Sequence, residues 1–122
     1  MTLEFYKVLH ILGLTLVVLS LGGIVAVVAN GGSKETNALR KATAISHGIG
    51  LLLLLVAGFG MLAKLGIMGA LPTWVVAKLI IWLLFGGLVA VAYKKPALAK
   101  KIWVLIPVLV LAATYLAVYK PQ

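Results

Sequence analysis

The chain has 122 residues, of which 64% are hydrophobic and only 11% are charged. Soluble domains carry about 45–50% apolar and about 25% charged residues, and a chain this short cannot bury such an apolar excess inside itself. The sequence has no cysteine and only two carboxylates, which excludes disulfides, iron–sulfur clusters and paired-carboxylate catalysis. The net charge of +9 falls largely in short connections between apolar runs, so we expect contacts with anionic lipid and no nucleic-acid partner.

Four apolar runs follow one another along the chain, each close to the roughly 20 residues that span the hydrocarbon core of a bilayer. They cover about residues 8–29, 42–63, 74–93 and 102–119. Such continuous runs form helices in lipid, because only helices and closed barrels satisfy the backbone hydrogen bonds there. Short connections make neighbouring helices antiparallel. The sequence therefore predicts a single all-α domain over residues 1–122, an integral membrane four-helix bundle with up-down-up-down topology.

The positions of the basic residues predict how the bundle is oriented. Cytoplasmic loops of membrane proteins carry an excess of Lys and Arg. Seven such residues cluster around the first and third connections, against three on the opposite side and one inside a span. The seven are Lys34, Arg40, Lys41, Lys94, Lys95, Lys100 and Lys101. We therefore expect these connections in the cytoplasm and both termini on the outer side of the membrane.

Small residues four positions apart allow membrane helices to approach each other closely. The sequence has four such pairs, so we expect close helix contacts at these positions, within the bundle, in a homo-oligomer or in a larger membrane complex. The pairs are Gly22 with Ala26, Ala44 with Gly48, Gly86 with Ala90, and Ala113 with Ala117.

Two ionisable residues, His10 and Lys78, lie inside apolar runs, where such groups are functional candidates by default. With a rise of 1.5 Å per residue, they lie roughly 9 Å and 8 Å from the bilayer centre, on the same side. Tyr115 lies near that level in the fourth run. His47 lies on the other side of the centre, on the order of 17 Å from His10 along the membrane normal. The depths therefore disfavour a haem held by both histidines of one chain.

The level shared by His10 and Lys78 permits a haem pocket. Neutral imidazole ligates haem iron, and a lysine amine can do so when it is deprotonated. Gly13, one turn from His10, would leave a side-chain-free patch for a flat macrocycle. Trp82 could form a wall of this pocket, and Lys7 could meet a propionate at the membrane interface.

Simpler interpretations of the same residues stay open. Lys78 could extend its long side chain to the lipid headgroups. His10 could form a hydrogen bond between helices, and we expect His47 to do so as a second polar site. Tyr115 could belong to an interfacial belt of aromatic residues, which membrane proteins commonly have.

Several segments are similar to a known protein family in order, spacing and helix position. They are Lys7–His10, Ile45–His47, Trp74–Leu79, the basic end of the third run, and the ending with Tyr115, Lys120 and Pro121. With these segments the chain resembles the SirB-like small four-helix membrane proteins of bacteria over almost its whole length. That family is related in pattern to the HemJ-type protoporphyrinogen oxidases and the CopD-type membrane domains.

The resemblance implies a bacterial inner (cytoplasmic) membrane protein and assigns b-type haem to His10 and Lys78, as in the HemJ-like group. His47 matches the SirB-like pattern instead. The sequence lacks the Leu-Pro-Arg segment and the Tyr-His pair of HemJ-like proteins, and three methionines with two separated histidines argue against copper transport.

We therefore expect a redox-type membrane protein that binds haem b in an outer-leaflet pocket. The alternative is a structural or accessory subunit of a larger membrane complex with no cofactor of its own. Protoporphyrinogen oxidation is a third, lower alternative, so whether the protein is an enzyme stays open.

Overall fold

The computed structural model describes residues 2–120; Met1, Pro121 and Gln122 lie outside the described residues. Within this range the chain forms four long helices, α1 (Leu3–Ala29), α2 (Arg40–Leu65), α3 (Thr73–Lys94) and α4 (Ala99–Tyr119). A single 3₁₀ turn, η1 (Pro96–Leu98), joins α3 to α4. Each long helix is long and apolar enough to cross a membrane. The prediction of an all-α membrane bundle is confirmed.

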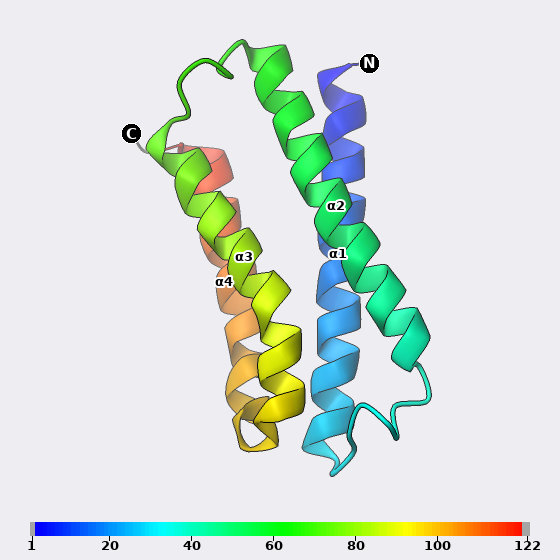
Figure 1. The fold of residues 1–122 in the computed structure, drawn as a ribbon. Coiled ribbons are helices and arrows are strands. Elements are labelled where there is room, and N and C mark those ends of the chain that lie inside the picture. Colours follow the sequence, from blue (N-terminus) through cyan, green and yellow to red (C-terminus); the bar gives the residue numbers. More distant parts are fainter. Residues whose placement is uncertain (1, 121–122) are drawn as a thin grey trace.

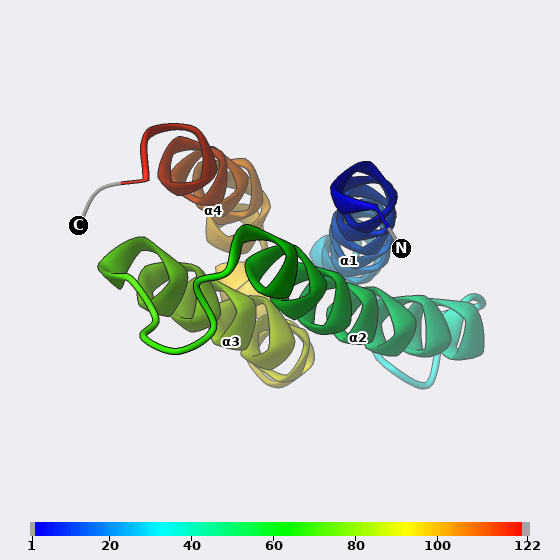
Figure 2. The same ribbon diagram turned by 90° about the horizontal axis from the view of Figure 1, so that it is seen from above.

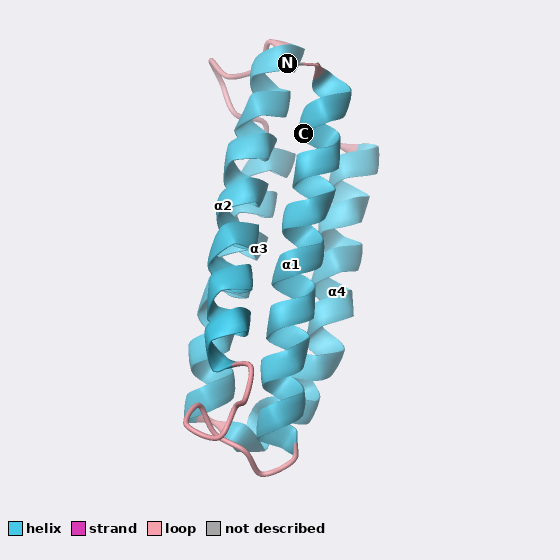
Figure 3. Ribbon diagram, turned by 90° about the vertical axis from the view of Figure 1, so that its right-hand side faces the viewer, coloured by secondary structure: helices cyan, strands magenta, loops and turns pink. Residues whose placement is uncertain are grey.

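The helices alternate in direction, so the bundle has two distinct ends (Figure 1). We call the end where α1 begins and α4 finishes the terminal end; it also carries the connection from Gly66 to Pro72 between α2 and α3. The opposite end carries the connections after α1 and after α3 with the seven clustered Lys and Arg residues, and we call it the basic end. Figure 3 shows the four helices side by side along the length of the bundle.

The helix ends follow from local sequence. The Thr2 hydroxyl accepts a hydrogen bond from the Phe5 N–H at 3.1 Å and so caps the start of α1. Gly66 ends α2 with φ of +73°, a conformation that glycine adopts without the steric cost of a side chain. The Gly66 N–H bonds the carbonyls of Ala63 and Leu62, two of the acceptors that a helix end otherwise leaves free.

α1 and α2 touch backbone to backbone where they cross (Figure 2). A Cβ on Gly50 would lie 2.7 Å from the carbonyl oxygen of Gly13, and a Cβ on Gly13 would lie 2.8 Å from that of Gly50. No side chain fits at either position without moving one helix. These two glycines therefore fix the crossing, and close approach of this kind is how membrane helices gain packing energy.

The pairs of small residues four positions apart do not include Gly13 or Gly50, where α1 and α2 cross. A Cβ on Gly48 would meet nothing within 4 Å, and one on Gly22 or Gly86 would meet only a side chain at 3.9 or 3.7 Å. The glycines of these pairs are therefore less tightly packed in the bundle than Gly13 and Gly50. The spacing shows that two small residues share a helix face, but it does not show which neighbour that face meets.

The buried core lies toward the basic end and is contributed mainly by α1, α3 and α4. Its fully buried members include Val17, Leu21 and Ile24 of α1 and Phe85 of α3. At the same end the amide of Asn37 donates to the Tyr93 hydroxyl at 3.0 Å and so ties the first connection to α3. The terminal half has only a small buried cluster formed by Leu62, Trp74 and Val75.

The outer faces of the helices carry large apolar side chains that no part of the described chain covers. Leu19 is 68% exposed, Leu83 is 63% exposed and Leu111 is 70% exposed. Exposure of such an apolar surface to water around the whole bundle would be unfavourable, whereas contact with lipid tails is favourable. The chain is a multi-pass membrane protein.

Candidate ligand-binding cavity

A cavity of about 520 Å³ opens in the terminal half of the bundle, where residues of all four helices line it. This volume lies in the range of about 300–1,000 Å³ typical of small-molecule sites. The walls are mostly apolar and include Leu14, Leu54, Phe59, Leu79 and Phe85. The cavity occupies the level of the bundle where the buried core gives way to looser packing.

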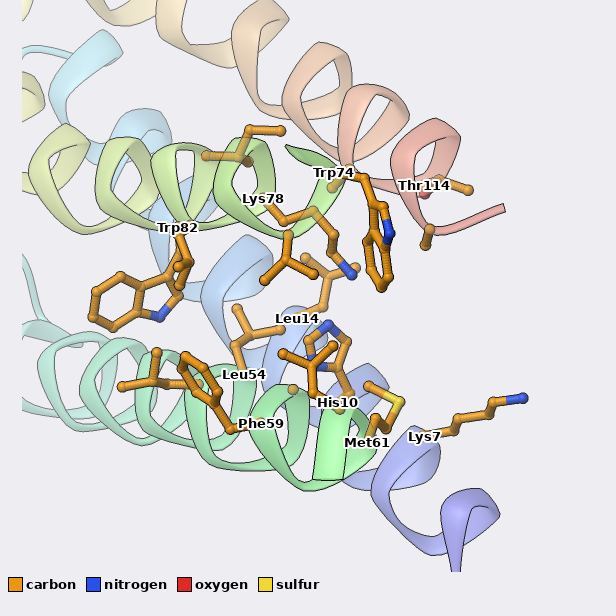
Figure 4. A pocket seen from close by; sticks show the side chains of 18 of the residues that line it. Lys7, His10, Leu14, Leu54, Phe59, Met61, Trp74, Lys78, Trp82 and Thr114 are labelled. Atoms are coloured by element: carbon orange, nitrogen blue, oxygen red, sulfur yellow. The ribbon is translucent and has the colours of Figure 1, made fainter. Parts of the chain in front are cut away.

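His10 of α1 projects into this cavity (Figure 4). Its imidazole lies over Gly58 of α2, where a Cβ would come within 3.5 Å of Cε1 and 3.7 Å of Nδ1. Nδ1 is buried against α2 and has no hydrogen-bond partner between residues 2 and 120. The opposite nitrogen, Nε2, is turned toward the cavity. The ring of His10 thus lies close to the backbone of α2 at position 58, with Nε2 on the side of the cavity.

Lys78 enters the cavity from α3, on the wall opposite α1 and α2. Its half-buried side chain runs toward His10 and passes beside Trp74 (Figure 4). The two carboxylates, Glu4 and Glu35, are exposed, and neither lines the cavity. An ammonium group in an apolar space is costly unless it is paired or neutral. No acidic side chain between residues 2 and 120 lines the cavity.

Trp82 forms the inner wall that the sequence suggested. It lines the cavity, and its indole N–H donates to the Leu51 carbonyl at 2.9 Å. This hydrogen bond joins α3 to α2 beside the cavity. Lys7 also borders the cavity, but its side chain points away from His10 and Lys78 (Figure 4).

Two residues expected at the pocket lie elsewhere. Gly13 is buried in the contact with Gly50, so α2 already covers the patch that was expected to receive a macrocycle. Tyr115 is 55% exposed and packs against Tyr119, with ring centroids 4.8 Å apart, on the outside of α4. Gly13 therefore faces α2 and Tyr115 faces outward, and neither lines the cavity.

His47 lies apart from the cavity, in the packed half of the bundle. It is 8% exposed, and its Nδ1 lies 3.4 Å from the hydroxyl of Ser20 on α1. The Ser20 hydroxyl is also within 3.0 Å of the Val17 carbonyl. His47 therefore makes the hydrogen bond between helices that the sequence suggested.

Gly58, Phe59 and Lys120 are among the cavity residues that were not predicted from the sequence. Gly58 carried no signal beyond being a small residue within an apolar helix. Phe59 looked like any apolar residue of a span. Lys120 entered only the charge count and the ending that resembles the SirB-like pattern, although it follows the last residue of α4 and lies beside Trp74.

The cavity offers few side chains that can bind a metal ion. Between residues 2 and 120 no three His, Cys, Asp or Glu side chains gather into a cluster able to hold a bare metal ion. Two nitrogen donors, one imidazole and one amine, instead face a mainly apolar space from opposite helices.

Comparison of the chain with protein-family models, curated proteins and solved structures gives no match.

Proposed function

We propose that the protein is a redox-type membrane protein that binds b-type haem in this cavity, with His10 and Lys78 as the axial ligands. The observation that carries the proposal is that α1 and α3 bring these two side chains into one cavity. Each stands on a different wall, and Nε2 of His10 is turned toward the interior.

The remaining lining fits a flat, largely apolar group. Aromatic and branched side chains dominate the walls, and the polar groups collect toward the terminal end. His10 would hold the iron through Nε2, and the apolar lining would exclude water from it. Trp82 would hold its wall in place through the bond to Leu51. Haem supplies reversible one-electron chemistry, tuned by its axial ligands and its surroundings.

The proposal includes membership of the SirB-like pattern, for which the order of His10, His47 and Lys78 along the helices is the support. It also includes an orientation with the terminal end on the outer face of a bacterial inner membrane, supported by the charge of the basic end. Oxidation of protoporphyrinogen ranks lower. Complementation of a strain defective in that step would test it directly.

The decisive experiment is the absorption spectrum of the protein expressed with ample haem and purified in detergent, in the oxidised and reduced states. We expect a Soret band that His10→Ala and Lys78→Met each abolish. His47→Ala is the matched control, because His47 lies outside the cavity and the variant should keep the band. A colourless wild type would refute the proposal, as would equal loss of haem from all three variants.

A second function, that of an accessory subunit, is favoured by a groove between α1 and α4. Gly22, Gly23 and Ala26 leave room along α1, and Trp103 and Pro107 of α4 form part of the other wall. The groove is apolar and suits a helix of another membrane protein. Stoichiometric recovery of one partner by crosslinking from position 103, together with absence of haem, would favour this function.

A further inference from the structure

We infer that Lys120 anchors an acidic group of the ligand that occupies the cavity, so that this ligand is an amphipathic anion. The assignment of the acidic group to a haem propionate depends on the proposed function. The requirement for an anion does not, because it depends only on the arrangement of charge around the cavity.

The backbone places Lys120 at the mouth of the cavity. It follows α4 in the left-handed conformation, with φ of +47° and ψ of +57°, and its N–H bonds the Leu116 carbonyl at 3.0 Å. Such a conformation is uncommon for a residue other than glycine. Among residues 2–120, Lys120 is the one residue other than glycine with positive φ. The resulting turn directs the side chain back toward α3 instead of along the axis of α4.

The side chain then meets the aromatic wall of the cavity. Its Nζ lies 5.6 Å from the centre of the Trp74 ring, within the range of a cation–π contact. Trp74 is only 7% exposed and lines the cavity, as Lys120 does. The ammonium is therefore held beside the entrance, with its charge next to an apolar space.

Between residues 2 and 120, the Lys, Arg, Asp and Glu side chains that line the cavity are all lysines, namely Lys7, Lys78 and Lys120. Lys120 lies beside Trp74, and both residues line the same cavity as Lys78. Neither carboxylate of the chain lines the cavity. Beside an apolar space, where water screens charges less, the Lys120 ammonium attracts an anion more strongly than it would in bulk water. A ligand that carries an acid would pair with this ammonium.

Lys120 is better placed for this role than Lys7, the residue that the sequence suggested. Lys7 borders the cavity, but its side chain extends away from the other cavity residues (Figure 4). Lys120 is attached to the cavity wall through Trp74. Lys7 therefore serves as a natural control, because it has the same charge and borders the same cavity.

An apolar cavity with a cation at its mouth favours the binding of a molecule that has an apolar part and a carboxylate group. Two classes share this chemistry, a porphyrin with propionates and a single-chain fatty acid. Each has a neutral counterpart in which the acid is esterified, with little change to the apolar part. Comparison of acid with ester therefore isolates the contribution of the charge.

The test measures dissociation constants of delipidated protein in a neutral detergent for four probes: haem, haem dimethyl ester, palmitate and methyl palmitate. We expect the wild type to bind the acid of at least one pair about tenfold or more tightly than its ester, as for one charge-assisted hydrogen bond. Lys120→Gly should remove this preference and leave ester binding unchanged. Glycine suits the backbone conformation at position 120, so this variant should fold.

Two further variants serve as controls. Lys120→Asn tolerates the same backbone conformation and should also lose the preference for the acid. Lys7→Gln should keep it. An equal loss of acid and ester binding in both Lys120 variants would overturn the inference, and so would a wild type that binds acid and ester equally.

The four probes also separate this inference from the proposed function. If neither haem nor its ester binds but palmitate is preferred over its ester through Lys120, the haem proposal fails and the anion site stands. If haem and its ester bind equally well, and palmitate and its ester do too, the haem proposal stands and the anion site fails. Binding of no probe would refute both.

Discussion

The two halves of the bundle use the same four helices but pack them differently. Toward the basic end, Val17, Leu21 and Phe85 are almost fully buried, and His47 is held by Ser20. Toward the terminal end the helices enclose a cavity that His10 lines, and no residue between 2 and 120 forms a hydrogen bond with the buried Nδ1 of His10. In the half at the basic end, polar side chains contribute to the packing of the helices. In the half at the terminal end, polar side chains line a cavity and are available to a ligand.

Removal of a core side chain from the packed half should have the largest effect on stability. Leu21 is 0% exposed, and Leu21→Ala should lower the free energy of unfolding by about 2–5 kcal/mol through lost contacts and the void left behind. Chemical unfolding in detergent, followed by circular dichroism, measures the change. Leu19→Ala removes the same atoms from a side chain that is 68% exposed, and an equal cost there would contradict the packing described.

The crossing of α1 and α2 should be the next most sensitive point. Gly50→Ala places a Cβ where the Gly13 carbonyl lies 2.7 Å away, so we expect a loss of about 1–3 kcal/mol from overpacking. Gly48→Ala, two residues away on the same helix, meets nothing within 4 Å and should be neutral or slightly stabilising. Equal melting temperatures for the two variants would show that the helices do not cross at Gly50.

The two histidines should differ in what they stabilise. His47→Ala removes the bond to Ser20 and some packing, and should cost about 1–2 kcal/mol of unfolding free energy. His10→Ala should cost less, because the ring faces a cavity and its Nδ1 gains no hydrogen bond from residues 2–120. Both variants are compared in the absence of added ligand. A larger loss at His10 than at His47 would reverse the contrast between the halves.

The smallest effect on stability should come from loss of the hydrogen bond between Trp82 and Leu51, which joins α3 to α2 beside the cavity. Trp82→Phe keeps most of the ring but removes the N–H that reaches the Leu51 carbonyl, and should cost about 0.5–1.5 kcal/mol. Amide hydrogen exchange should show faster exchange in the middle of α2 and α3. Trp103→Phe, at a side chain that is 56% exposed, should leave exchange in these segments unchanged.

The helices could be predicted from the sequence because apolar runs of membrane length leave the backbone no alternative. The common level of His10 and Lys78 could be predicted from the helical rise, and the structure lines one cavity with both. Their role as haem ligands stays a prediction.

The direction in which each residue faces could not be predicted in the same way. Gly13 and Tyr115 were both expected at the pocket, yet Gly13 is covered by α2 and Tyr115 faces outward. In helices that are apolar all round, periodicity does not distinguish the inner face from the outer one. The position of Lys120 depends on a left-handed backbone conformation that lysine rarely adopts. No sequence pattern therefore predicted that Lys120 lies at the cavity.

The shared position of the start of α1 and the end of α4 has a practical consequence for purification (Figure 1). A polyhistidine tag on either terminus would bring additional imidazoles to the end of the bundle where the cavity opens, and free imidazole nitrogens can ligate haem iron. An absorption spectrum from such a protein would not distinguish His10 from the tag. The exposed residues Lys34 and Glu35, at the basic end, offer an insertion site at the far end of the helices.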